Sequence, residues 1–372
     1  MSKTQTTHTI TPTDREALGF IARFPGADTA TVTQALLANP SRFDNDGIER
    51  SIHPTQGVVN RRMLRLEQAG AIQAWRSPAA RITHYGILEG GKDALKMFGQ
   101  EPPYEPRSIA NKTGTALMHA RDIANVAAQF MHGEYVDPAV TSLIGDEVPL
   151  EAFITDTQMH SAVYKYRKDS NGASLYQHIT NTLARATTEQ VSTPDFWVMH
   201  PELLVLTAPA DVSTHEARTH RPDMVILTES GKRVAVEVER NIKPLSKYVD
   251  TMRLLYSTLK GGYQIKGSTD RVAPVQRLVW LCADNSIKNA IKKAANAVDP
   301  SLISQGLVII ADLTRADGTP LVYEETVPAP RRRRTRPQKV TDPGAMKPKT
   351  PKKTLTLGAL AGATGRATTP QP

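Results

Sequence analysis

Three carboxylates in one short stretch of the sequence are the residues best suited to catalysis. Asp223 precedes the apolar run MVIL, and Glu237 and Glu239 lie two positions apart in the run RVAVEVE that follows a turn at 229–232. The side chains of a strand alternate between its faces, so both glutamates share a face with Ala235. If the two runs form a hairpin, Asp223 comes close to Glu237.

Two acids on one face of so apolar a strand are costly to bury unless a positive group compensates them. Mg²⁺ or Mn²⁺ suits such a site, since both ions favour carboxylate ligands, and we expect Asp223 and Glu237 to bind it. A bound ion of this kind readies a water and stabilises the leaving oxygen when a phosphodiester is cleaved. The alternative is a structural network in which the glutamates pair with Arg240, Lys243 or Lys247.

The order Pro-Asp, turn, Glu-Val-Glu and helix resembles the PD-(D/E)XK nuclease superfamily. The resemblance implies that Asp223 and Glu237 bind metal and that a lysine polarises the attacking water. Here Glu239 stands in place of that lysine, and an anion there adds repulsion. Lys243 and Lys247, early in the expected helix 243–259, are the candidates to replace it in space.

Two alternatives follow for activity. The chain is either a Mg²⁺-dependent DNA endonuclease or nickase, or a catalytically inactive scaffold, and Glu239 makes us expect the scaffold. Four nearby residues are also weighed as metal-site groups. We expect His119 to be a packing residue of an apolar helix, and His215, Glu216 and His220 to be polar loop residues.

Residues 12–99 have the element order of a winged helix-turn-helix. Segments 13–25, 29–37 and 55–70 have helical apolar spacing, with Thr13 as the expected N-cap of the first and Glu16 three residues on. Segments 71–76 and 81–88 predict two strands around a turn, and 92–99 a closing helix. Residues 39–54 are polar and are interpreted as an insertion.

In a winged helix the third helix enters the major groove of DNA and the wing touches the backbone. In the helix within 55–70 we expect Val59, Met63 and Leu66 to face the core. Arginine can bond guanine or phosphate, and asparagine can read adenine. The predicted DNA contacts are therefore Asn60, Arg61, Arg62 and Arg65 of that helix, and Arg76 and Arg81 beside the wing turn. A solvated helix face, or a module for dimerisation or docking, is the alternative.

The rest of the chain divides by composition. Residues 1–11 are expected to be a flexible N-terminus and 100–107 a proline-rich linker. Residues 108–327 are expected to be an α/β domain with a mixed sheet, starting with a helix over 114–133. Strands are expected at 203–207, 221–239, 275–283 and 306–313, with helices at 243–259 and 285–298. Residues 134–200 permit no assignment beyond two or three short elements.

The last 45 residues, 328–372, predict a disordered basic tail, because they hold 11 of the chain's 46 Lys and Arg residues and one of its 37 Asp and Glu residues. The net charge of +9 therefore belongs to the tail and says nothing of DNA binding by the folded part. The tail is expected to bind nucleic acid non-specifically or an acidic partner, and a solubilising extension is the alternative.

The absence of an apolar leader or a long apolar run predicts a cytoplasmic protein with no membrane partner. A single cysteine, Cys282, excludes a disulfide framework and a cysteine-based zinc site.

Taken together, a winged helix, the helix LMHARDIANVAAQF and the carboxylate motif resemble the replication-relaxation family of plasmid and phage proteins, over about residues 12–315. The resemblance implies a DNA-binding accessory protein of a mobile element, acting in replication, relaxation or transfer. Its partners would be double-stranded DNA and a relaxase or replication protein, with a homodimer left open. The alternative is a winged-helix transcriptional repressor whose second domain serves dimerisation or protein docking.

Overall fold

The architecture comes from a computed structural model of the chain, which describes residues 10–37, 41–43, 49–51, 54–77, 82–100, 109, 112, 114–133, 135, 137–145, 147–169, 174–208, 219–269 and 271–314. The predicted tail lies outside the described residues, as does the 100–107 linker apart from Gln100. The described part is mixed α/β.

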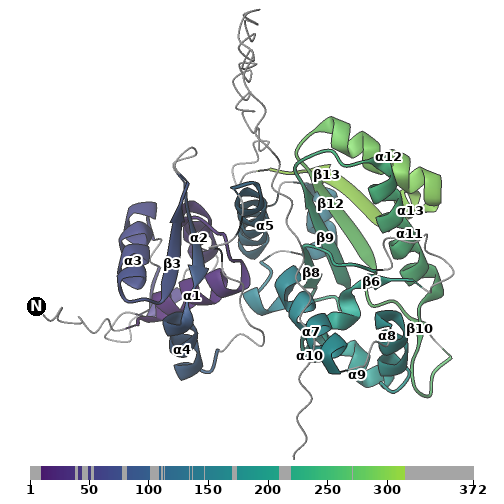
Figure 1. Ribbon diagram of the computed structural model, residues 1–372, viewed down its shortest axis with the longest axis horizontal. Helices are drawn as coiled ribbons and strands as arrows, with labels where there is room; N and C mark the ends of the chain where they lie inside the picture. The colour runs from purple at the N-terminus through teal and green to yellow at the C-terminus, as the bar shows by residue number, and fades with distance from the viewer. Residues whose placement is uncertain are drawn as a thin grey trace, which may run out of the picture. The chain divides into compact units, whose positions relative to one another are not determined.

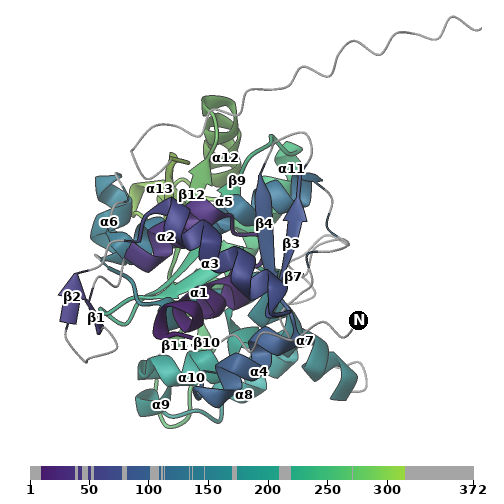
Figure 2. The same cartoon turned by 90° about the vertical axis from the view of Figure 1, so that its left-hand side faces the viewer.

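The N-terminal elements confirm the predicted order of helices and strands. Helices α1 (Pro12–Arg23), α2 (Thr29–Leu37) and α3 (Gln56–Gln68) are followed by the hairpin β3 (Ile72–Arg76) and β4 (Thr83–Ile87), then by α4 (Glu89–Met97). In Figure 2 these helices and the hairpin face the viewer. The predicted insertion contains a two-stranded antiparallel ribbon, β1 (Ser41–Phe43) and β2 (Glu49–Ser51).

The predicted start of the first helix was wrong by two residues. Thr11, not Thr13, is the N-cap, and Asp14 completes the capping box by accepting from the Thr11 amide at 2.9 Å. Pro12 at the first helical position explains the shift, because its missing N–H and fixed φ favour that site. The expected capping chemistry, a threonine with an acid three residues later, is present two residues earlier in the chain than predicted.

The second part of the fold is a five-stranded mixed sheet, of which β8, β9, β12 and β13 are labelled to the right of α5 in Figure 1. Its order is β13 (Val308–Asp312), β12 (Arg277–Cys282), β9 (Arg233–Glu239), β8 (Met224–Leu227) and β5 (Phe153–Thr155). β12 is parallel to both β13 and β9, whereas β8 is antiparallel to β9 and to β5. The hairpin and the later βαβ units are as predicted.

Helices pack on both faces of this sheet. α5 (Gly114–His132) contacts β9, and α6 (Pro138–Ile144) contacts β13. A large apolar cluster joins Ala235, Leu278 and Trp280 of the sheet to α11 (Leu245–Gly261) and α12 (Asn285–Val298). Side chains two positions apart in a strand share a face, so Glu237 and Glu239 lie on the same face of β9 as Ala235, toward α11 and α12.

The stretch 134–200, which the sequence left without assignment, is mostly helical. It contains α6, the turn η1 (Leu150–Ala152), the edge strand β5, α7 (Asp156–Asp169), α8 (Leu175–Leu183), α9 (Thr188–Ser192) and α10 (Pro194–Met199). The expected strand at 203–207 was largely wrong, since η2 (Pro201–Leu204) takes its first residues and only β6 (Leu206–Thr207) is a strand. The pairing partner of β6 is β7 (Thr219–His220).

Three shorter elements complete the fold. β10 (Tyr263–Gln264) pairs with β11 (Arg271–Val272), and α13 (Ser301–Ser304) precedes β13. Within the described ranges, no helix is both long enough and apolar enough to cross a lipid bilayer.

Candidate functional site

The hairpin β8–β9 brings the predicted carboxylates together. Its register pairs Met224 with Val236 and Val225 with Ala235, so Asp223, one position before β8, lies opposite Glu237 on the same face. Directly opposed side chains in an antiparallel pair are neighbours, with Cβ atoms about 5 Å apart. The β8–β9 register therefore explains why Asp223 and Glu237 come close together, as the sequence predicted.

Each of the two opposed carboxylates is held by a histidine. His119 of α5 contacts Asp223 with 3.2 Å between Nε2 and Oδ1, and His220 of β7 contacts Glu237 with 2.6 Å between Nε2 and Oε1. The Val238 amide donates to the second Asp223 oxygen at 2.8 Å. Both histidines were weighed as metal-site groups but expected to be packing or loop residues, and this expectation was wrong.

The third carboxylate, Glu239, has a lysine as its partner. Lys243 Nζ lies 2.6 Å from Glu239 Oε2, and its charge also acts on Asp223 and Glu237. Lys243 is therefore the cation at the cluster that the predicted replacement requires. Lys247 is exposed in the first turn of α11, and its part in the site stays a prediction.

The opposed acids differ in how their protonation is set. Burial acts to raise the pKa of Asp223, but the hydrogen bond and charge of His119 outweigh it and hold that pKa below its ordinary value. Burial raises the pKa of Glu237, and the opposing charge of His220 does not cancel this. Two carboxylates that share a site characteristically separate in this way, one favouring the charged form and the other the neutral form.

Lys243 and His220 are biased toward their charged forms, whereas Glu239 is biased toward its neutral form. Burial acts to lower the pKa of Lys243, yet the Glu239 hydrogen bond and the surrounding carboxylates raise it above its ordinary value. Burial likewise opposes the charging of His220, and the charge of Glu237 raises its pKa overall. For Glu239, burial raises the pKa despite the Lys243 contact. The cluster thus combines two glutamates whose pKa is raised, an aspartate whose pKa is lowered and a lysine whose pKa is raised.

Arg240, the alternative partner for the glutamates, makes its ion pair elsewhere. Its Nε lies 2.9 Å from Asp122 Oδ2 of α5, both side chains being buried or nearly so. The pair joins the end of β9 to α5, the helix that also carries His119. The structural network that the sequence offered as an alternative is therefore present in part, through Lys243 and not through Arg240.

The donor chemistry of Asp223 and Glu237 fits a hard divalent ion, since Glu237 offers buried and Asp223 partly exposed carboxylate oxygens, and Glu239 is a third acid at the cluster. Among the residues that the structure describes, however, no group of three or more His, Cys, Asp or Glu side chains is arranged to hold a metal. His215 and Glu216, the other candidates weighed, lie outside the described residues.

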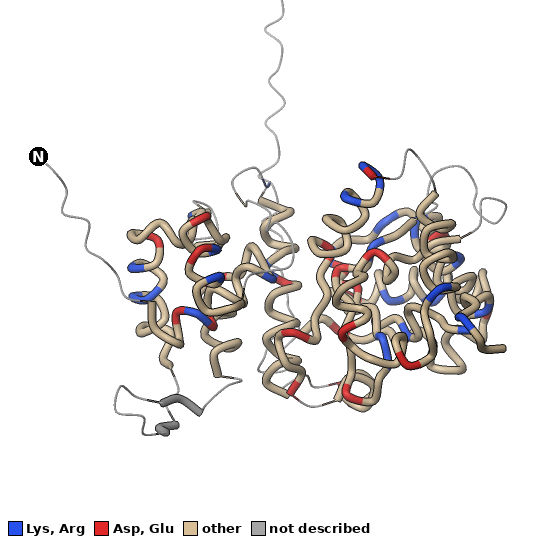
Figure 3. Tube along the Cα trace, turned by 90° about the horizontal axis from the view of Figure 1, so that it is seen from below, with Lys and Arg blue, Asp and Glu red and all other residues tan. Residues whose placement is uncertain are grey.

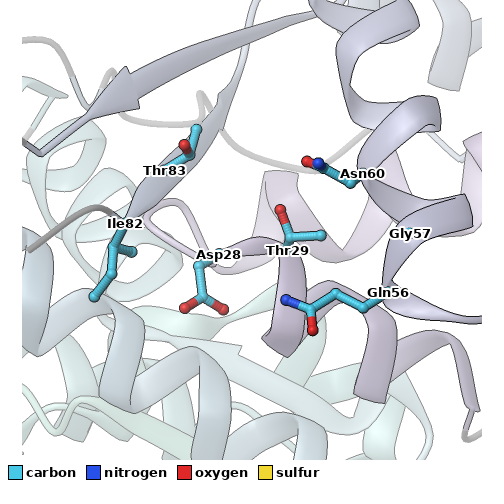
Figure 4. A pocket seen from close by; sticks show the side chains of 7 residues that line it. All are labelled: Asp28, Thr29, Gln56, Gly57, Asn60, Ile82 and Thr83. Carbon is cyan, nitrogen blue, oxygen red and sulfur yellow. The ribbon is translucent and has the colours of Figure 1, made fainter.

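The second candidate site is the outer face of α3. Val59, Met63 and Leu66 are buried, as predicted, whereas Asn60, Arg61 and Arg65 are exposed. A polar pocket of about 490 Å³ lies between α3, the start of α2 and β4. Figure 4 shows its side chains, among them Asp28, Thr29, Gln56, Asn60 and Thr83.

The other predicted DNA contacts have different surroundings. Arg62 donates to Asp14 Oδ1 at 2.9 Å and to Thr11 Oγ1 at 2.7 Å, so its guanidinium anchors α3 to the start of α1. Arg76 forms a two-pronged ion pair with Glu67 at 2.6 and 3.0 Å. Arg81 lies outside the described residues.

Both signs of charge are interspersed along the described trace in Figure 3. The face of α3 is therefore distinguished by its local arrangement of arginine and amide side chains. No protein-family model matches the chain, and neither a curated protein nor a solved structure is similar to it at a significant level.

Proposed function

We propose that the protein is a DNA-binding accessory protein of a mobile element, with α3 as the DNA-reading helix and the α/β part as a nuclease-type domain. Duplex DNA is the expected partner of α3. The cluster of Asp223, Glu237, Glu239 and Lys243 is the expected position of any phosphodiester chemistry.

The exposed face of α3 is the observation that carries DNA binding. A helix whose inward positions are fully buried presents Arg61 and Arg65 to solvent, and Asn60 stands beside a polar pocket wide enough to receive groups of a DNA strand. Arginine contacts both guanine edges and phosphates, and asparagine contacts adenine.

DNA binding can be tested by fluorescence anisotropy on the full-length protein with labelled random duplex. Arg61→Ala and Arg65→Ala should each weaken binding about tenfold, and the salt dependence should become less steep by about one unit for each phosphate that the variant no longer binds. Lys293→Ala removes an equal charge from exposed α12 and is the matched control. Equal affinity for all four proteins would contradict α3 as the reading helix.

The nuclease-type assignment rests on the opposed Asp223 and Glu237 with Lys243 at the same cluster. When bound, a divalent ion would supply charge for a developing phosphate oxyanion, and Asp223 and Glu237 are the residues that would hold it. Lys243, protonated and fixed by Glu239, would orient a water or a phosphate oxygen there. His119 and His220 hold the two acids in place.

Metal binding has a readout that does not depend on cleavage. Calorimetric titration with Mn²⁺ should show one site in the wild type, and Asp223→Asn or Glu237→Gln should weaken it at least tenfold. Asp195→Asn, an exposed acid in α10, is the control. Failure of the wild type to bind Mn²⁺ would leave an α/β domain that is retained for DNA binding or docking alone, which is the repressor-like alternative.

A further inference from the structure

A second pocket lies at the other end of the sheet from the carboxylate cluster. Its volume is about 370 Å³, and it opens at the amino ends of β9 and β12, where Lys232 precedes β9 and Arg277 begins β12. Lys260, near the end of α11, forms a further wall. Leu259 and Leu307 give the pocket an apolar side.

The charge of this pocket is one-sided. Three cations reach it, from the turn before β9, from α11 and from β12, and no Asp or Glu is among the residues that line it. Neither Lys232 nor Arg277 makes an ion pair with any described residue, whereas the charge of Lys260 also acts on Asp299. Like charges held together repel, and an anion bound between them would relieve that repulsion.

Hydrogen bonds fix the polar wall of the pocket before any ligand arrives. The Arg233 amide donates to Gln276 Oε1 at 3.0 Å, which leaves the side-chain NH₂ of Gln276 as a donor. Arg277 Nη1 donates to the Gln276 carbonyl at 2.7 Å, so the guanidinium is oriented while its other N–H groups stay available. The buried Arg233 side chain also donates to the Ala273 carbonyl, which holds the adjoining loop. Pre-positioned donors reduce the entropy cost of binding.

We propose that this pocket binds a phosphate group, carried by a mononucleotide or by the backbone of a nucleic-acid strand. The guanidinium fork of Arg277 matches phosphate oxygens in pairs, and the two lysines add compact charges. The volume lies in the range of ligand pockets, and the apolar wall can take a base or a sugar. The inference goes beyond the proposed function, because it depends neither on α3 nor on the carboxylate cluster.

The test measures binding of two probes to the full-length protein by fluorescence anisotropy, in EDTA so that no metal takes part. The probes are a labelled adenine mononucleotide and a labelled short DNA single strand. The variants are Arg277→Gln and Lys232→Gln, with Lys293→Gln on exposed α12 as the charge-matched control. Every variant carries the same basic tail, so differences between variants report the pocket.

We expect Arg277→Gln and Lys232→Gln to weaken at least one probe about tenfold, with Lys293→Gln within twofold of the wild type. Mononucleotide binding that inorganic phosphate competes away identifies the phosphate of a mononucleotide as the ligand. An effect limited to the DNA single strand identifies contact with a nucleic-acid backbone. Arg277→Lys, which keeps the charge but not the fork, should fall between. Equal binding by the pocket variants and the control on both probes, or no binding of either probe by the wild type, overturns the proposal.

Discussion

Arg62 separates the structural role of α3 from its proposed role in reading DNA. The sequence placed it with Asn60, Arg61 and Arg65 as a DNA contact, but its guanidinium is engaged with Asp14 and Thr11. The Asp14 side chain has no solvent exposure, and that of Arg62 has 25%. Replacing Arg62 by alanine therefore removes a cation from a buried carboxylate.

The size of the effect follows from these contacts. A hydrogen bond to a charged partner contributes about 1.5–3 kcal/mol, and breaking a fully buried ion pair costs about 3–5 kcal/mol. Asp14 keeps its bonds from Thr11, and water reaches Arg62, so the lower part of the range applies. We expect Arg62→Ala to lower the free energy of unfolding by about 2 kcal/mol.

Urea unfolding followed by far-UV circular dichroism measures this destabilisation. Arg61→Ala and Arg65→Ala, on the exposed face, should stay within about 0.5 kcal/mol of the wild type. A double-mutant cycle with Asp14→Asn should return a coupling energy of at least about 1 kcal/mol. The reasoning is refuted if Arg62→Ala is as stable as Arg61→Ala while weakening DNA binding as much as Arg65→Ala does.

Three further outcomes follow from other parts of the structure. Gly26 has φ +115°, and a Cβ there would lie 2.7 Å from Ala120 Cβ, so Gly26→Ala should lower the free energy of unfolding in urea by about 2 kcal/mol. Gly57 has open space around it, so Gly57→Ala should cost nothing. Equal stability of the two variants would contradict this reasoning. Burial raises the pKa of the Cys282 thiol to about 12, so the folded protein should not react with a disulfide reagent at about pH 8. Rapid stoichiometric reaction of the native protein would contradict this. Burial acts to raise the pKa of Glu202, but hydrogen bonds from two histidines and a backbone amide hold it below 4.5. The stability that ionised Glu202 provides should therefore be present above about pH 4.5 and be lost as the pH falls through the lowered pKa of the folded state. The measurement is the difference in unfolding free energy between the wild type and Glu202→Gln, which should shrink on acidification. A difference that grows would contradict the argument.

The elements that sequence reasoning predicted well are those whose apolar spacing is set by one neighbouring layer. Val59, Met63 and Leu66 of α3 are buried because each is one helical turn from the next. The βαβ order after residue 233 likewise follows from local patterns. Periodicity and turn chemistry therefore carried most of the architecture.

The candidate site was predicted only as far as the hairpin register reaches. Opposition of Asp223 and Glu237 follows from strand pairing, and a lysine in the first turn after β9 is local enough to anticipate. His119 reaches Asp223 across 104 residues of sequence, a contact that no local pattern encodes. The same limit explains Arg62, whose partner Asp14 lies in another helix.

The segment 134–200 eluded prediction for a related reason. Its α-helices are short, from five to fourteen residues. The N-cap of α9, Thr187, and the N-cap of α10, Thr193, are only a few residues apart in the sequence. Helices of that length draw their stability from the core they pack against more than from their own propensity. Trp197 shows this, since it is almost fully buried and stacks under Arg233 from a distant strand.

Glu239 in the lysine position favours an inactive scaffold, whereas Lys243 beside it supplies the cation that catalysis requires. Cleavage of plasmid DNA tests most directly the claim that follows from Lys243, namely that the cluster of Asp223, Glu237, Glu239 and Lys243 is catalytic. Supercoiled and single-stranded circles are incubated with the full-length protein and Mg²⁺ or Mn²⁺, beside Asp223→Asn, Glu237→Gln and Lys243→Gln, with Lys293→Gln as the charge-matched control. Metal-dependent nicking by the wild type and the control, reduced at least a hundredfold in the three cluster variants, is the predicted result for an active nuclease-type domain. Nicking that persists in the cluster variants, or wild-type protein that binds DNA and Mn²⁺ without cutting under any of these conditions, would contradict a catalytic role for the cluster.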